Sequence, residues 1–141
     1  MSKSDEMKVT KYVSKKLKIN FANSKFILDG WGQVDNYCKI NDDAYLFLEV
    51  ETKQKHPCTN VLKLYPFLEE HKNLKIILVQ YYFTSSPGLT SNRGKLSFWL
   101  GMKLQELFKN RFYYFREVFE EDTLTSNKQI FSLLQTIKSK N

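Results

Sequence analysis

Two glutamates and a lysine alternate near the end of one predicted strand, in the run Glu49-Val50-Glu51-Thr52-Lys53. Alternate residues of a strand project from the same face, about 7 Å apart. Like charges at this spacing repel each other unless a cation lies between them. The run therefore predicts a cation site, while the alternative, an ordinary amphipathic hairpin, would place one such acid among neutral residues or opposite a lysine.

The strand that carries these acids is predicted to form a hairpin with the segment before it. Residues 34–40 and 44–53 alternate in polarity with period two on either side of a turn at residues 41–43. One face is expected to be buried, with Val34, Cys38, Ile40, Leu46, Leu48 and Val50. The opposite face then holds Gln33, Asp35, Tyr37, Tyr45, Phe47, Glu49, Glu51 and Lys53.

A third carboxylate comes from Asp35 on the first strand of this hairpin. If the hairpin is centred on Asp42, the numbers of paired residues add up to 84, so Asp35 faces Glu49 and lies diagonally beside Glu51. A two-residue turn would break this arrangement unless a bulge restored it. Carboxylates without a neighbouring Cys or His ligand suit Mg²⁺ or Mn²⁺ rather than zinc.

The remaining elements must bring these strands together. Helices are predicted at residues 4–19, from residue 57 to 68 with a break or kink at Pro66, at 95–109 and at 127–138. Strands are predicted at 26–28, at 74–83, where the apolar run is typical of a strand covered on both faces, and at 112–119. The helix at 95–109 is expected to turn inward Leu96, Trp99, Leu100, Leu104 and Leu107.

The resulting order is α-β-β-β-α-β followed by α-β-α, which predicts an α/β protein (α+β mixed sheet) with helices on the sheet's faces. The length of 141 residues is that of one domain, residues 1–141. Within it, the core is expected to cover about residues 4–83 and an elaboration about residues 84–141.

The hairpin resembles the motif of the PD-(D/E)XK nuclease superfamily, whose fold is called restriction-endonuclease-like. The motif has an acid on the second core strand and an acid-x-lysine at the end of the third, here Val34-Asp35 and Glu51-Thr52-Lys53. Val34 replaces the proline of the family name, which ligates nothing. The pattern acid-x-lysine occurs three times in the chain, but only this copy ends a strand and follows a partner strand that bears an acid.

The resemblance implies a Mg²⁺- or Mn²⁺-dependent nuclease that hydrolyses phosphodiester bonds of nucleic acid, DNA rather than RNA. Asp35, Glu51 and the backbone carbonyl of Thr52 would hold the metal, with Glu49 and Glu6 as additional ligands. Lys53 would orient the attacking water and stabilise the developing oxyanion. The alternatives are a catalytically inactive nuclease-like or basic αβ module that binds nucleic acid or a protein partner, and a subunit of a larger complex or homodimer.

The chain is basic, with 22 Lys and Arg residues against 15 Asp and Glu residues and a net charge of +7. A positive field favours polyanionic partners, although many basic proteins bind none. The candidate contacts to nucleic acid are polar or basic residues near the predicted site and on the first helix: Gln54, Asn60, Lys63, Arg93, Lys95, Lys11 and Lys15. For each of them, a solvated surface position is the alternative.

The remaining features argue against other classes of protein. The first residues lack the apolar core of a signal peptide, and the longest apolar stretch is interrupted by Gln80, so we expect a cytoplasmic protein that does not interact with a membrane. Cys38, Cys58 and the two histidines follow no zinc-site spacing. The chain also lacks a glycine-rich phosphate loop.

Overall fold

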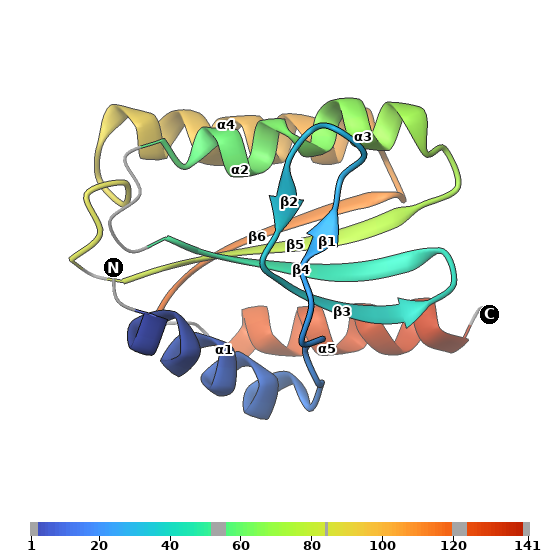
Figure 1. Cartoon of the computed structure of the whole chain (residues 1–141), viewed down its shortest axis with the longest axis horizontal. Coiled ribbons are helices and arrows are strands. Elements are labelled where there is room, and N and C mark those ends of the chain that lie inside the picture. Colours follow the sequence, from blue (N-terminus) through green and yellow to red (C-terminus); the bar gives the residue numbers. More distant parts are fainter. Residues whose placement is uncertain (1–2, 52–55, 84, 120–123, 140–141) are drawn as a thin grey trace.

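The computed structural model describes residues 3–51, 56–83, 85–119 and 124–139 (Figure 1). A four-stranded sheet consists of β3 (Asn36–Asn41), β4 (Ala44–Glu51), β5 (Lys75–Tyr82) and β6 (Phe112–Val118), in that spatial order. The β3–β4 pair is antiparallel, and the β4–β5 and β5–β6 pairs are parallel. The mixed α/β architecture expected from the sequence is confirmed, and β6 of the predicted elaboration completes the same sheet.

Helices form a layer on each side of the sheet. One layer consists of α2 (Cys58–Leu62), α3 (Leu64–Glu70) and α4 (Asn92–Leu107), and the other of α1 (Lys3–Leu17) and α5 (Leu124–Ser139) (Figure 1). Among the described residues, every helix is too short or too polar to span a bilayer. The parallel strands all end at the same edge of the sheet, where Glu51 is paired with Tyr82 and Tyr82 with Val118.

The predicted strand at residues 34–40 is divided in the structure. Its first part, β2 (Gln33–Val34), pairs with β1 (Phe26–Ile27) in a separate two-stranded sheet. Val34 is buried in the core beneath α2 and α3 rather than with Cys38 and Ile40, so its predicted place on their face is wrong. Asp35 lies between the two strands. The alternation of faces along one continuous strand therefore does not determine the direction of its side chain.

The hairpin combines the two turn geometries that the sequence left open. Asn41 pairs with Ala44 across a two-residue turn, and a bulge between Lys39 and Asn41 shifts the register. From Lys39 back to Asn36, the numbers of paired residues add up to 84. The bulge thereby restores the register expected for a hairpin centred on Asp42, which places Asp35 beside Glu49.

The sheet is buried on both faces, as its apolar strands require. Phe47, Ile76, Leu78, Phe112 and other residues pack beneath the layer of α2, α3 and α4. Leu46, Leu48, Ile77 and Val79 pack with Val9, Val13 and Leu17 of α1 and with α5. The even-numbered residues of β4 therefore face α1 and α5, and its odd-numbered residues, including both glutamates, face α2.

The expected helix at 57–68 is broken into α2 and α3 at Lys63. Pro66 consequently lies in the first turn of α3, where its missing N–H and fixed φ are tolerated. The break confirms the prediction made from this proline. It also leaves Lys63 at the junction of the two helices, from which its side chain extends toward the sheet.

The inward face predicted for α4 is wrong in three of its five residues. Leu96, Trp99 and Leu107 are each 57% exposed, whereas the buried line consists of Gly94, Ser97, Gly101 and Leu104. A Cβ at residue 101 would lie 2.6 Å from the ring of Tyr114. Small residues therefore let α4 approach the sheet closely. Close packing of the helix backbone on the sheet outweighs the burial of the largest side chains of α4.

Candidate active site

Glu51 is the last residue of β4 and its carboxylate is buried beneath α2. Asn60 of α2 donates its Nδ2 to both carboxylate oxygens, at 3.0 and 3.1 Å. Gln80 of β5 donates its Nε2 to Oε2 at 2.6 Å. Each carboxylate oxygen offers about two lone pairs, so Oε1, with one bond, retains a lone pair for a further partner. Two amides thus fix the orientation of a buried acid.

Glu49 lies two residues earlier on the same face and is paired with Lys63. Nζ of Lys63 lies 3.0 Å from Oε1 of Glu49, and the two side chains are only 14% and 12% exposed. The same ammonium donates to Oδ1 of Asn60 at 3.1 Å and to the backbone oxygen of Gln33 at 2.8 Å. Lys63 therefore connects the two glutamates through Asn60, and it supplies the positive charge nearest to them among the described residues.

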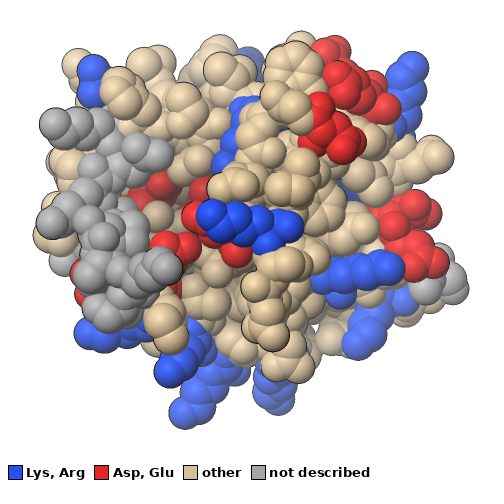
Figure 2. All heavy atoms as spheres, in the orientation of Figure 1, with Lys and Arg blue, Asp and Glu red and all other residues tan. Residues whose placement is uncertain are grey.

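Asp35 lies at the outer side of this pair. It precedes the first residue of β3, and its charge is one of those that raise the pKa of Glu49. Its side chain is 52% exposed and forms an ion pair with Lys25 at 3.7 Å. Figure 2 shows acidic side chains gathered left of centre, with basic side chains around them. The structure therefore brings Asp35 near Glu49, the residue predicted only as an additional ligand.

Burial dominates the electrostatics of the two glutamates. It raises the pKa of Glu49 to about 8, against the lowering effect of Lys63 and with smaller contributions from the charges of Glu51 and Asp35. Burial likewise raises the pKa of Glu51, although Asn60 and Gln80 stabilise its ionised form. Two neighbouring carboxylates with raised pKa values form a site in which an added cation would be stabilising.

A buried polar network behind Glu51 was not predicted as part of the site. Gln80 donates to Glu51 and to the backbone oxygen of Pro57, and its Oε1 accepts from Ser97 at 3.0 Å and from Tyr114 at 2.5 Å. The sequence signal was available, because Gln80 is the one polar residue within the apolar run of β5. Nothing comparable distinguishes Ser97 or Tyr114 from other residues of their elements.

The donors that could hold a metal are all oxygen atoms. Glu49 and Glu51 each retain acceptor capacity, since Oε2 of Glu49 accepts no hydrogen bond from the described part of the chain. Such a set fits Mg²⁺ or Mn²⁺ better than zinc. Within the described ranges, no group of three or more His, Cys, Asp and Glu side chains is placed to hold a metal ion. The expected third ligand, the carbonyl of Thr52, lies outside the described residues, as do Lys53 and Gln54.

Glu6 lies beyond Asp35 rather than beside the two glutamates. Its Oε1 accepts from Nδ2 of Asn36 at 3.1 Å. Glu6 and Asp35 line a common cavity of about 470 Å³, together with Met7, Thr10, Lys11, Asn23, Ser24, Lys25 and Asn36. Among the residues that the structure describes, Glu6 is thus connected to the site through Asp35.

The predicted contacts to nucleic acid fall into three groups. Asn60 and Lys63 are partly buried and bind the acidic side chains. Arg93 and Lys95 lie exposed in the first turns of α4. Lys11 and Lys15 are exposed on α1, where Figure 2 shows basic side chains along the lower edge of the molecule.

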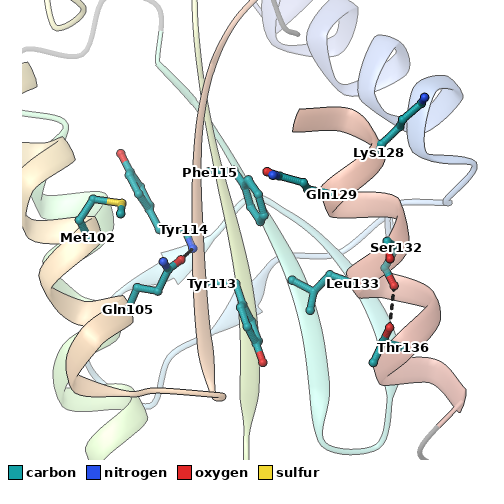
Figure 3. Close-up of a pocket in the computed structure, with 10 residues that line it drawn as sticks. All are labelled: Met102, Gln105, Tyr113, Tyr114, Phe115, Lys128, Gln129, Ser132, Leu133 and Thr136. Carbon is teal, nitrogen blue, oxygen red and sulfur yellow. Dashed lines mark hydrogen bonds between the residues drawn. The ribbon is translucent and has the colours of Figure 1, made fainter. Parts of the chain in front are cut away.

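A second hollow, about 770 Å³ in volume, lies along β6 between α4 and α5 (Figure 3). Gln105 of α4 accepts the backbone N–H of Tyr114 at 2.8 Å and so covers part of this edge strand. Among its lining residues, Lys128 is the one with a charged side chain. The groove therefore lacks the acids that a cation site needs, and the glutamates of β4 remain the candidate active site.

Comparisons of the chain with models of known protein families, with curated protein sequences and with solved structures found no match.

Proposed function

We propose that this protein is a divalent-metal-dependent nuclease that hydrolyses phosphodiester bonds of nucleic acid, with DNA as the expected substrate. The observation that carries the proposal is a pair of glutamates at the carboxyl end of β4, of which Glu51 is buried and Glu49 is largely removed from solvent. Two acids on one face beneath α2, with Lys63 as the one ammonium that the described residues place against them, are costly to keep ionised without a further cation. The carboxyl edge of parallel strands is also where sites of α/β proteins commonly lie.

The described residues support distinct roles in this function. Glu51 and Glu49 would hold the cation, with Asp35 beside Glu49. Asn60 and Gln80 fix the Glu51 carboxylate, so that the ligand is already oriented before metal binds. When bound, Mg²⁺ supplies a water of lowered pKa and neutralises charge on the scissile phosphate. Lys53 stays the residue predicted to orient that water.

The positive surface supports a polyanionic substrate. Lys11 and Lys15 are exposed on α1, and the net charge of the chain is +7. Lys11 also lines the cavity that contains Asp35, so basic side chains lie within reach of the acidic site. Phosphate contacts from such residues position a nucleic acid without reading its sequence.

A second candidate function is a module of the same kind that binds nucleic acid without cutting it. The ion pair between Lys63 and Glu49 favours this alternative, because the ammonium already neutralises one of the two acids. The two candidates differ in what a metal does. A nuclease requires it for cleavage, whereas a binding module needs only its basic surface.

Cleavage assays separate the two candidates. Supercoiled plasmid, linear duplex, single-stranded DNA and RNA are incubated with the purified protein in Mg²⁺, in Mn²⁺ and in EDTA. Cleavage that requires metal and is lost in Glu51→Gln, but kept in the matched control Glu69→Gln on the exposed end of α3, supports the nuclease. Salt-sensitive binding without cleavage supports the binding module, and neither activity would contradict both.

A further inference from the structure

The outward face of α4 carries large apolar side chains that stay exposed among the described residues. Leu96, Trp99 and Leu107 are each 57% exposed, and Phe98 and Met102 are also exposed. The inner face of the same helix is already in contact with the sheet through Gly101 and Leu104. A helix with apolar residues on both faces is typical of a buried helix, so this face is suited to a partner.

The outermost line of α4 has a symmetrical pattern. Lys95, Trp99, Met102 and Glu106 are spaced by four, three and four residues, which places them along one stripe of the helix. Read from either end, the stripe has a charged residue, two large apolar residues and a charged residue. The two end charges are opposite, which makes the stripe complementary to its own reverse.

We propose that α4 is a self-association surface, on which α4 of a second copy of the chain packs in the antiparallel direction. In that arrangement, Lys95 of each copy lies beside Glu106 of the other, and Trp99 of each copy packs against Met102 of the other. A two-fold axis produces both contacts twice, as in isologous dimers. The opposite charges fix the direction, because a parallel pair would bring like charges together.

The local contacts of α4 are compatible with such an interface. Lys103 forms an exposed ion pair with Glu106 at 3.4 Å, and its ammonium lies 5.7 Å from the centre of the Trp99 ring. The stem of Lys103 therefore extends the apolar stripe while its charge stays at the rim. Lys95, which the sequence suggested as a contact to nucleic acid, becomes part of the interface.

The interface is expected to be of limited strength. One helix of 16 residues offers a contact about 24 Å long, which is small beside the surfaces of permanent dimers. We therefore expect an equilibrium between monomer and dimer in the micromolar range. Sedimentation equilibrium of the whole chain, in EDTA and without nucleic acid, measures it independently of any nuclease activity.

Two sets of variants test the proposal. Trp99→Glu is expected to weaken the dimer at least tenfold, whereas Ile27→Glu, an equally exposed apolar residue of β1 at 60%, leaves it unchanged. Lys95→Glu and Glu106→Lys each weaken the dimer, and the double variant Lys95→Glu, Glu106→Lys recovers it because the opposite charges meet again. Circular dichroism confirms that each variant is folded.

Each remaining outcome overturns the proposal. A wild-type chain that stays monomeric throughout the micromolar range has no such interface. A dimer that tolerates Trp99→Glu uses another surface. Loss of the dimer in both charge variants without recovery in the double variant would show that Lys95 and Glu106 do not meet across an antiparallel pair.

Discussion

The ammonium of Lys63 lies 3.0 Å from Oε1 of Glu49, and both side chains are largely removed from solvent. The ammonium therefore offsets part of the negative charge that a bound cation would otherwise neutralise. Lys63 comes from the junction of α2 and α3, so the break in the helix and the charge balance of the site are linked. The first prediction concerns what happens when this ammonium is removed.

Lys63→Met keeps the aliphatic stem but leaves Glu49 without its ion-pair partner. At about pH 9 in EDTA, we expect the free energy of unfolding to fall by about 2–4 kcal/mol, because a buried charge loses its compensation. Urea denaturation measures the loss. Mg²⁺ should recover part of it in the variant, more than it adds to the wild type.

Lys103→Met is the matched control, because Lys103 also pairs with a glutamate but at an exposed position. It should change stability by no more than about 0.5 kcal/mol. Equal losses in the two variants would contradict the role assigned to Lys63.

The second prediction concerns pH. The pKa of Glu49 is about 8 in the folded protein and 4.5 in its ordinary state. Between these values the folded chain binds a proton that the unfolded chain releases, so stability should decrease as pH rises. For one proton the slope approaches about 1.4 kcal/mol per pH unit, and the raised pKa of Glu51 acts in the same direction.

Glu49→Gln should flatten this dependence between about pH 5 and pH 8, as followed by urea denaturation in EDTA. Glu69→Gln, at an exposed position of α3, serves as the control and should retain the wild-type slope. If the slope of Glu49→Gln is also unchanged, another group is responsible for the pH dependence.

The third prediction concerns the network behind Glu51. Gln80→Leu removes four hydrogen bonds, to Glu51, the backbone oxygen of Pro57, Ser97 and Tyr114, and leaves these buried groups without this partner. We expect a loss of about 2–4 kcal/mol in stability, because buried polar groups left unpaired retain their desolvation cost. Metal affinity, measured by calorimetry with Mn²⁺, should also fall, since the carboxylate of Glu51 keeps its bonds from Asn60 but loses the one from Gln80.

Gln129→Leu on the exposed face of α5 is the control for the same exchange of side chains and should be near neutral. A Gln80→Leu variant that matches it in both stability and Mn²⁺ affinity would show that the network does not support the site.

The order of helices and strands followed from periodicity, because an amphipathic face must match the spacing of its element. The buried face of β4 followed as well, since Leu46 and Leu48 alternate with its polar residues, but the register stayed open between two turns until the bulge between Lys39 and Asn41 was seen. The division of the predicted strand at Asp35 did not follow. A two-stranded sheet formed by β1 and β2 depends on packing against α3, which the local pattern does not contain.

The site was predictable in its acids but not in their partners. Glu49, Glu51 and Asp35 were marked by charge within an apolar pattern. Asn60 and Lys63 were expected to face a substrate, yet they bind the acids, because the direction of α2 over β4 is a tertiary feature. The buried face of α4 also escaped prediction, since close packing favoured its small residues over its large ones.

The fourth prediction tests that close packing directly. Gly101→Ala places a Cβ 2.6 Å from the ring of Tyr114, whose hydroxyl is held by Gln80 and whose backbone N–H is held by Gln105. The ring is therefore not free to move away. An alanine normally stabilises a helix by about 1 kcal/mol relative to glycine, but here we expect a net loss of about 1–3 kcal/mol from overpacking. In a Tyr114→Leu background, which removes the ring, the same exchange should be neutral or stabilising. A loss of the same size in both backgrounds, measured by urea denaturation, would show that contact with Tyr114 is not why residue 101 is glycine.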